Sequence, residues 1–437
     1  MQSYTEADWL AHQIPITGRF FALALQCLRS AVVISCWLVA ISAPVVAAPV
    51  PLTLSDAIRF TLEEHPELRA FSHRQAAFDA EVQQAGVAQR ARVGLLVEDA
   101  VGTGEYDSFN RSQSTLSIDW ILEQDAIDSR VKAAQAAATQ VDFKQEIKAL
   151  DLAAHTAKLF LEALVQQKRL ELAKLAENQS QQALSAIAKR VEAGKGSETE
   201  RLQTEAELAR RELQVEDLQH ELKSGRYQLV ASWAGNEQDY LPMGDLYRIP
   251  VVNSFNQELR KLQQHPAVQA FANQQRIAES KMELARIEAK PKWELSAGFR
   301  RYEATDDYGL VAGVSIPWGT DNRSTGKIRA LRARQAEYQA EAQALSRKLN
   351  TQLYVLLTEI NHSRHVIETL TGRVIPLLEK ALSQSSQAYE IGQLGYVQWT
   401  AVRQDLLASR AELLDAYLAI HLQHIEIQRL TGASLVQ

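Results

Sequence analysis

An internal duplication constrains the fold of this chain more than any other feature of its sequence. Leu62–Phe71 reads LEEHPELRAF, and Leu262–Phe271 reads LQQHPAVQAF, at an offset of 200 residues. Two later glycine-containing segments, Ala193–Ser197 and Ile391–Gly395, correspond at an offset of 198. A period of this length is not that of a short solenoid repeat. The chain is therefore expected to contain two near-equal copies of one long structural unit.

Both copies predict the same order of elements. A capped helix comes first and is interrupted at His65-Pro66 or His265-Pro266, because proline fixes its own φ and drives the preceding residue out of the helical region. Two strands with alternating polar and apolar residues follow. The expected strands are 93–102 and 114–122 in the first copy, and 292–303 and 308–318 in the second.

A long helical hairpin completes each copy. Residues 123–193 contain neither glycine nor proline, and about 70 helical residues extend on the order of 100 Å. The matching stretch of the second copy is 323–391, which Pro376 is expected to kink or break. After a glycine-containing turn each copy returns as another helix, over 199–233 or 397–430. The expected fold is therefore mainly α with a small β part.

The first 48 residues differ from the rest of the chain. Arg19 and Arg29 flank apolar sequence, and Ala47 and Ala48 offer small residues for cleavage, as in a secretory signal peptide. A membrane anchor and lipidation at Cys36 are the alternatives. We expect a signal peptide over 1–48, followed by the domain boundaries set out here: a first repeat over 49–235, a connector over 236–252 and a second repeat over 253–437.

Composition excludes several classes of protein. The only cysteines are Cys27 and Cys36, both within the expected signal peptide, so the remainder has no disulfide and no thiol chemistry. The formal net charge of −6 argues against a nucleic-acid-binding protein, which needs a basic face. Gly194–Ser197 lacks the first glycine of a P-loop, and the chain has no HExxH or GxSxG motif. We expect no catalytic residues and no cofactor.

The order of elements, together with local motifs, resembles the TolC-like outer-membrane efflux protein family over residues 51–432. The matching segments are Leu52–Ile58 followed by His65–Leu68, Arg190–Ser197, Val314–Asn322 and Ala388–Gly392. The resemblance implies a homotrimer in the outer membrane of a Gram-negative bacterium, with a tunnel of coiled-coil α-helices in the periplasm. Four strands are too few to close a β-barrel, so several subunits must pool their strands if these span a membrane. The resemblance implies that three subunits complete a 12-stranded barrel in contact with outer-membrane lipid.

Within that family the chain looks similar to CzcC-type components of heavy-metal cation efflux. Glu98–Tyr106 followed by Ser114–Ile118 carries this likeness, whereas Trp120–Asp125 departs from the proline and glycine pattern of those relatives. The resemblance implies the exit channel of a tripartite pump, opened by a periplasmic adaptor and energised by an inner-membrane transporter of the resistance-nodulation-division type. The alternatives are a duct for drugs or a type I secreted polypeptide, and a periplasmic coiled-coil adaptor or scaffold without a pore.

The two hairpin turns are the candidate functional site. Their glycines allow the positive φ that a tight turn between helices needs, and the resemblance places the turns at the periplasmic end, where the adaptor binds. The candidate contact residues are Arg190, Gly194, Lys195, Gly196, Ser197, Gly392, Gln393, Leu394 and Gly395. Glu198 and Glu200 follow the first turn. They are either aperture acids that favour cations or a solvated first turn that suits the helix dipole.

Two histidine pairs stand at helical i,i+3 spacing, His362/His365 and His421/His424. Such a pair can share a metal on one helix face, and a transient cation site is one interpretation. Neither pair has an obvious third ligand nearby in the sequence. The favoured interpretation is ordinary polar helix surface, with no metal site.

Overall fold

The computed structural model describes residues 50–233, 235, 240–319 and 322–435. All of them belong to one compact unit, Val50–Gln437. The expected signal peptide over 1–48, with Cys27 and Cys36, lies outside the described residues.

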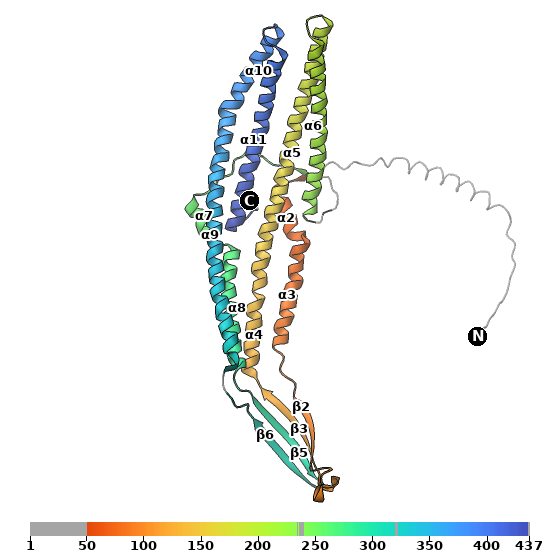
Figure 1. Cartoon of the computed structure of the whole chain (residues 1–437), viewed down its shortest axis with the longest axis vertical. Helices are drawn as coiled ribbons and strands as arrows, with labels where there is room; N and C mark the ends of the chain where they lie inside the picture. The colour runs from red at the N-terminus through yellow and green to blue at the C-terminus, as the bar shows by residue number, and fades with distance from the viewer. Residues whose placement is uncertain (1–49, 234, 236–239, 320–321, 436–437) are drawn as a thin grey trace, which may run out of the picture. The chain divides into compact units, whose positions relative to one another are not determined.

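The first copy follows the predicted order of helix, strand pair and helical hairpin (Figure 1). Its elements are β1 (Val50–Leu52), α2 (Leu54–Glu64), α3 (Pro66–Ala85), β2 (Arg92–Glu98), η1 (Gly104–Tyr106), η2 (Phe109–Arg111), β3 (Gln113–Leu122), α4 (Gln124–Ala138), α5 (Gln140–Glu192) and α6 (Glu198–Ala231).

The second copy repeats this order after a short strand within the connector. Its elements are β4 (Tyr240–Pro242), α7 (Phe255–Leu262), α8 (Pro266–Glu288), β5 (Trp293–Tyr302), β6 (Asp307–Ser315), η3 (Asn322–Ser324), α9 (Thr325–Thr369), η4 (Leu370–Val374), α10 (Ile375–Glu390) and α11 (Tyr396–Thr431).

The predicted interruption at both His-Pro steps is confirmed. His65 and His265 have extended backbones and stand immediately before α3 and α8. In each, the ring Nδ1 accepts a hydrogen bond of 3.1 Å from the main-chain N–H two residues further on. The imidazole therefore acts as the N-cap, because it accepts a hydrogen bond from a main-chain N–H that has no partner within the first turn of the helix.

The predicted single helix over 123–193 is wrong at one point, Thr139, where α4 ends and α5 begins. The Thr139 hydroxyl lies 2.7 Å from the Ala136 carbonyl and 3.1 Å from Asn273 Oδ1 on α8. A threonine bond to a carbonyl one turn back bends a helix more often than it ends one, so the contact that sets Thr139 apart is the one with Asn273 of α8. In the second copy the predicted disturbance near Pro376 is present, but as a π-helical turn and not as a break: η4 lies between α9 and α10 and precedes Pro376, which lacks an N–H for regular helical bonding.

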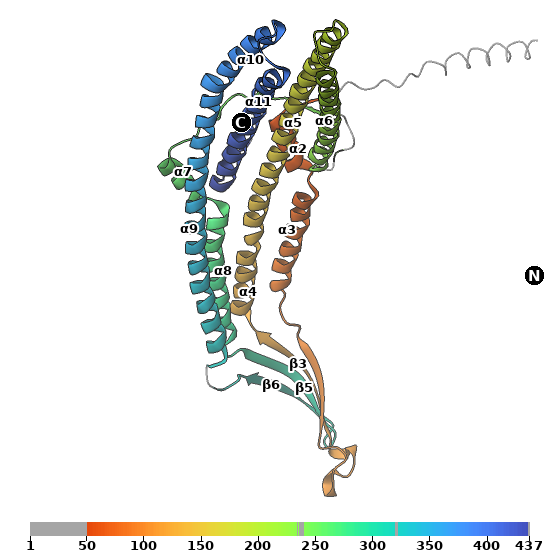
Figure 2. The same ribbon diagram turned by 45° about the horizontal axis from the view of Figure 1, so that its top comes forward.

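Four antiparallel strands form the main sheet, in the order β2-β3-β5-β6. β2 ends at Glu98, short of the predicted residue 102, because Asp99 and Val101 adopt positive φ of 56° and 57°. Figures 1 and 2 show the sheet at one end of the helices, and the α5–α6 and α10–α11 turns at the other. No described strand pairs with the free edges of β2 and β6.

A second, two-stranded sheet was not predicted. β1 pairs in parallel with β4, with Val50 opposite Tyr240. The pair joins the start of the first copy to the connector and packs with the largest apolar core. That core draws on α2, α5, α6, α9 and α11, and Phe160, Leu353 and Ile420 are at most 1% exposed within it. Among the helices of the described residues, none is long and apolar enough to cross a membrane.

Candidate functional site

The first hairpin turn, between α5 and α6, is closed by main-chain hydrogen bonds. Gly194 N–H donates to the Val191 carbonyl at 2.9 Å, and Lys195 N–H donates to the Arg190 carbonyl at 2.8 Å. Gly194 has a φ of 70°, as predicted for this turn. The Ser197 hydroxyl then accepts from Thr199 N–H at 3.2 Å and caps α6.

The second turn, between α10 and α11, has the same bond pattern. Gly392 N–H donates to the Tyr389 carbonyl at 3.1 Å, Gln393 N–H donates to the Ala388 carbonyl at 2.8 Å, and Gly392 has a φ of 76°. The duplication recognised in the sequence therefore extends to the hydrogen bonds of the turns. It also places Gly194 and Gly392 at equivalent points, where the left-handed conformation favours glycine.

The other two turn glycines do not need positive φ, and the prediction for them is wrong. Only Gly194 and Gly392 of the four adopt it. Gly395 has a φ of −81° and caps α11, with its N–H donating to Gln398 Oε1 at 3.0 Å. Gly196 is small for a different reason: a Cβ there would lie 3.1 Å from the Val191 nitrogen. The turn folds back so closely onto its own helix that a side chain here would require a small shift of the backbone.

An aromatic cluster beneath the turns joins the two hairpins. Ile187 of α5 is 1% exposed and packs with Tyr389 and Tyr396, which flank the second turn. The Tyr389 ring stacks on Trp399, with centroids 5.0 Å apart and an interplanar angle of 6°. Trp399 Nε1 donates to the Ser386 hydroxyl at 3.0 Å. This cluster was not predicted, although three aromatic residues within eleven positions around one turn were a usable signal.

Arg190 connects the hairpins directly. Its guanidinium donates to the Tyr389 carbonyl at 3.0 Å and lies 4.7 Å from the centroid of the Tyr389 ring. The side chain is half-buried. Arg190 was predicted as an adaptor contact, and the structure places it between the hairpins, close to the predicted surface.

Two more buried polar groups lie in the same cluster. Burial raises the pKa of the Tyr389 phenol, and the Glu200 carboxylate adds to this effect. The Tyr389 hydroxyl has no hydrogen-bond partner in the described part of the chain. Arg403 is 5% exposed and lies 5.1 Å from the Trp399 ring. The interface between the hairpins is therefore polar as well as aromatic. Its buried polar groups are less completely hydrogen-bonded than those of an ordinary helical core.

The outer surface of the turns combines polar and apolar side chains. Lys195, Ser197 and Gln393 are exposed, and Leu394 is half-buried. Ile391 and Val397, which the sequence analysis did not single out, are each 69% exposed. Apolar side chains at a turn surrounded by polar groups suit contact with another protein.

The two candidate aperture acids have different surroundings. Glu198 is exposed and pairs with Arg201 of its own helix at 2.6 Å. That side-chain hydrogen bond holds the pKa of Glu198 below its usual value. Glu200 is half-buried and close enough to Tyr389 to affect its titration. Of the two, Glu200 is the one whose charge reaches the other hairpin.

The two histidine pairs also differ. His362 and His365 are exposed, as expected for polar helix surface. His421 and His424 are half-buried, and His421 Nε2 lies 2.9 Å from the Leu246 carbonyl in the connector. The surface interpretation is therefore wrong for the second pair. No group of three or more possible metal ligands occurs among the residues that the structure describes.

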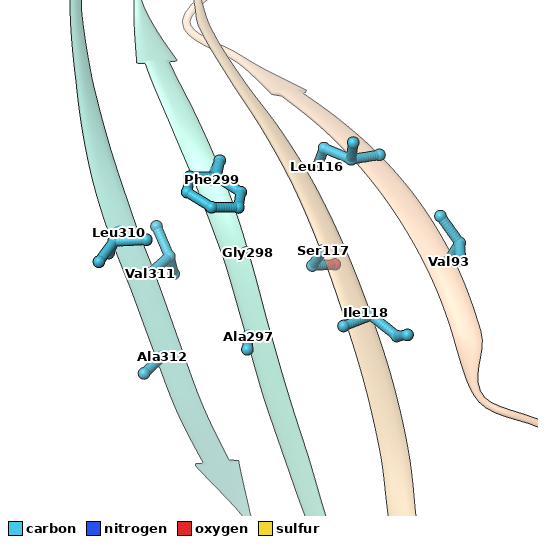
Figure 3. Close-up of a pocket in the computed structure, with 10 residues that line it drawn as sticks. All are labelled: Val93, Leu116, Ser117, Ile118, Ala297, Gly298, Phe299, Leu310, Val311 and Ala312. Atoms are coloured by element: carbon cyan, nitrogen blue, oxygen red, sulfur yellow. The ribbon is translucent and has the colours of Figure 1, made fainter.

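The main sheet has two chemically different faces, because directly opposed residues in adjacent strands point to the same side. One register row joins Leu95, Leu116, Phe299 and Leu310, and the next joins Val93, Ile118, Ala297 and Ala312. All of these residues except Leu95 line an open depression of about 550 Å³ (Figure 3). Phe299 is 66% exposed and Leu310 is 81% exposed, so no part of the described chain covers this face.

The opposite face is polar and contains an ion-pair network. Arg300 donates to Glu98 Oε2 at 2.9 Å, to Gln113 Oε1 at 3.1 Å and to the Thr115 hydroxyl at 2.8 Å. The register places four acidic and two basic side chains on this face: Glu98, Asp119, Glu294, Asp307, Arg92 and Arg300. The polar face is therefore acidic on balance.

Comparisons with known proteins identify a family for one part of the chain. Residues 57–235 match the sequence profile of the family described as outer membrane efflux protein. No curated protein matches the sequence.

Solved structures share the fold over most of the chain. One is CusC, whose report describes conformational changes accompanying folding and transmembrane channel formation; it has a TM-score of 0.71 and 14% identity, covering 87% of this chain and 92% of CusC. The outer membrane protein VceC from Vibrio cholerae has a TM-score of 0.69 and 16% identity, covering 88% of this chain and 97% of VceC. The open state of the MtrE outer membrane channel from Neisseria gonorrhoeae has a TM-score of 0.68 and 14% identity, covering 88% of this chain and 90% of MtrE. The predicted TolC-like fold is confirmed.

Proposed function

We propose that this chain, which belongs to the outer membrane efflux protein family through residues 57–235, is the outer-membrane exit channel of a tripartite efflux pump. Three copies form the channel, and its cargo is heavy-metal cations. The channel is a passive duct without a covalent step. A periplasmic adaptor docks at the hairpin turns, and an inner-membrane transporter of the resistance-nodulation-division type supplies the energy.

The two-faced sheet with free edges carries this proposal. A sheet that exposes Phe299 and Leu310 on one side needs an apolar environment there. Its edges, β2 and β6, present unpaired main-chain groups that invite pairing with another chain. Three copies joined edge to edge satisfy both needs: the apolar side faces outer-membrane lipid, and the polar side faces the interior of the duct.

The polar face supports a cation as cargo. In each chain the polar face has four acidic side chains, such as Glu98 and Asp119, and two basic ones, such as Arg300. A trimer would therefore have an acidic interior. Rings of carboxylates favour cations in pores. Glu200, whose charge reaches the second hairpin, is the better of the two aperture acids because Glu198 is already paired with Arg201.

The hairpin turns support the proposed partner. Lys195 and Gln393 offer polar contacts, and Ile391 and Val397 offer exposed apolar ones. Arg190 lies directly beneath them and holds the hairpins together. A partner that binds the turns is therefore well placed to change the distance between the hairpins.

Growth of a strain that lacks this chain tests the function. The strain is compared with its parent on Co²⁺, Zn²⁺, Cd²⁺, Ni²⁺, Cu⁺ and Ag⁺, and on drugs and detergents. We expect sensitivity to metals alone, reversed by the gene. Sensitivity to drugs or detergents alone would be consistent with a duct but would contradict heavy-metal cations as its cargo. Absence of a trimer resistant to unheated detergent from outer-membrane fractions would contradict the duct itself and favour a periplasmic scaffold.

A further inference from the structure

One buried carboxylate, that of Glu123, lies where the main sheet meets the helices. Its side chain is only 2% exposed. A glutamate is almost never buried to this degree unless it is paired. Glu123 follows β3 and precedes α4, but its side chain makes no capping bond to that helix. The carboxylate is directed to other parts of the chain.

The two carboxylate oxygens of Glu123 accept hydrogen bonds from two different segments that connect a helix to a strand. Oε1 accepts from the main-chain N–H of Gln89 at 2.9 Å, and Gln89 lies in the segment that leads from α3 to β2. Oε2 accepts from Lys292 Nζ at 2.8 Å, and Lys292 lies in the segment that leads from α8 to β5. With its own position between β3 and α4, Glu123 joins three passages between the sheet and the helices.

Arg130 extends this network onto a neighbouring helix. Its guanidinium lies 3.6 Å from Glu123 Oε1 and donates to the carbonyls of Ala85 and Val87, each at 3.3 Å, at the end of α3. Burial by itself raises the pKa of Glu123, but Lys292, the Gln89 N–H and Arg130 more than offset this, so the pKa lies below its usual value. Glu123 is therefore charged at neutral pH, and its contacts with Lys292 and Arg130 depend on that charge.

The sheet has few other means of holding its orientation. In the described part of the chain, none of β2, β3, β5 and β6 packs extensively against a helix. The ion pair near the sheet in the second copy, between Lys327 of α9 and Glu288 of α8, is exposed and joins two helices, so it does not hold the sheet.

We propose that Glu123 is a positioning residue that fixes the main sheet on its helices, because one carboxylate holds three of the passages between them. Three copies join edge to edge only if every sheet leaves its helices at the same angle. This consequence rests on the proposed function, whereas the clamp itself is a property of the single chain.

Hydrogen–deuterium exchange on the full chain in detergent tests the clamp. Glu123→Gln keeps the shape of the side chain and an acceptor for Gln89 but removes the charge. We expect exchange over 86–92 and 289–293 to become at least tenfold faster. Lys292→Gln is expected to have a smaller effect in the same direction, and the double variant is expected to exchange no faster than Glu123→Gln, because both changes break one contact.

A matched control removes a nearby ion pair that is exposed. Arg92 and Glu294 lie 2.8 Å apart at the same end of the sheet, and their side chains are 67% and 37% exposed. Glu294→Gln is expected to leave exchange over both segments unchanged. Wild-type exchange rates in Glu123→Gln would overturn the proposal.

Assembly provides the second readout. We expect Glu123→Gln to lose at least half of the trimer seen on unheated detergent gels, and Glu123→Asp, which keeps the charge, to recover most of it. If the loss of trimer came only from poor packing, Glu123→Asp, which shortens the side chain, would lose as much trimer as Glu123→Gln. Failure of the wild-type chain to form any trimer would refute the proposed function, and the exchange comparison would still decide the role of Glu123.

Discussion

Arg190 and Tyr389 lie 199 positions apart in the sequence, yet the Arg190 guanidinium donates to the Tyr389 carbonyl at 3.0 Å. The same guanidinium lies 4.7 Å from the centroid of the Tyr389 ring. One side chain of the first hairpin therefore holds both the backbone and the aromatic ring of the second. That carbonyl also accepts from Gly392 N–H, so the contact reaches into the second turn itself.

Loss of this contact is expected to loosen the turns. Arg190→Ala removes a charged hydrogen bond and a cation–π contact, together about 1–3 kcal/mol. We expect faster hydrogen exchange over 388–394 and, in a reconstituted trimer, a higher open probability in planar bilayers. Arg190→Lys keeps the charge without the planar fork, and it is expected to recover part of the effect.

Arg201 provides the control for Arg190. It forms exposed ion pairs with Glu198 and Glu205 on its own helix, at 2.6 Å and 3.0 Å, and does not bridge the hairpins. Arg201→Ala should leave exchange over 388–394 at the wild-type rate. Equal effects of Arg190→Ala and Arg201→Ala would show that the inter-hairpin contact has no special role.

The conformation of Gly194 predicts a destabilising substitution. Its φ of 70° disfavours any residue with a Cβ, although nothing lies within 4 Å of a Cβ built there. Gly194→Ala is expected to lower the free energy of unfolding by about 1–2 kcal/mol, from backbone strain alone. Gly326, in α9, has equally open surroundings but no positive φ. Gly326→Ala should therefore be neutral or slightly stabilising, and chemical denaturation of the two variants measures the difference.

The sequence predicted the repeated elements because their signals are local. Proline at 66 and 266 marked both helix breaks, and alternation marked the four main strands within a few residues. The break at Thr139 was not predicted because it depends on Asn273, a partner 134 residues away. The β1–β4 pair escaped for the same reason, since a three-residue strand has no pattern until its partner is known.

The candidate site could be located from the sequence but not assembled from it. The glycines marked the turns, and Gly194 and Gly392 have the expected conformation. The packing of Ile187 against Tyr389 and Tyr396 was not visible, because it requires the register between two hairpins. Glu123 was equally hidden: its burial depends on Lys292, at a separation of 169 residues.

His421 and His424 predict a loss of stability in acid. Burial lowers the pKa of both, and His424 Nδ1 is buried without a hydrogen-bond partner among the residues that the structure describes. The unfolded chain therefore takes up protons first as the pH falls below about 6.5, so the stabilising contribution of the neutral rings is present above that pH and is lost below it. Asp245, Glu258 and Lys261 are the charged groups near this pair.

Thermal unfolding between pH 8 and pH 5 measures this effect. We expect the midpoint to fall with pH, and His424→Leu to make the fall shallower, with His265 accounting for part of the remainder because burial also lowers its pKa. His220 has a side chain that is 76% exposed, so His220→Gln should leave the slope unchanged. Identical slopes in His424→Leu and the wild type would contradict the assignment.

Adjacent residues on β6 provide the sharpest test of the two faces of the sheet. Leu310 is 81% exposed and lies on the apolar face, opposite Phe299. Val311 follows it in the strand and therefore lies on the polar face, opposite Gly298. If the apolar face meets lipid, Leu310→Lys places a charge in hydrocarbon at a cost of about 2–4 kcal/mol near the middle of the membrane, and the amount of trimer in outer-membrane fractions should fall severalfold. Val311→Lys places the same charge on the water-filled side, so the trimer should persist while conductance for cations falls. Similar loss of trimer in both variants would contradict the assignment of the faces, because it would show that the sheet tolerates a new charge on neither side.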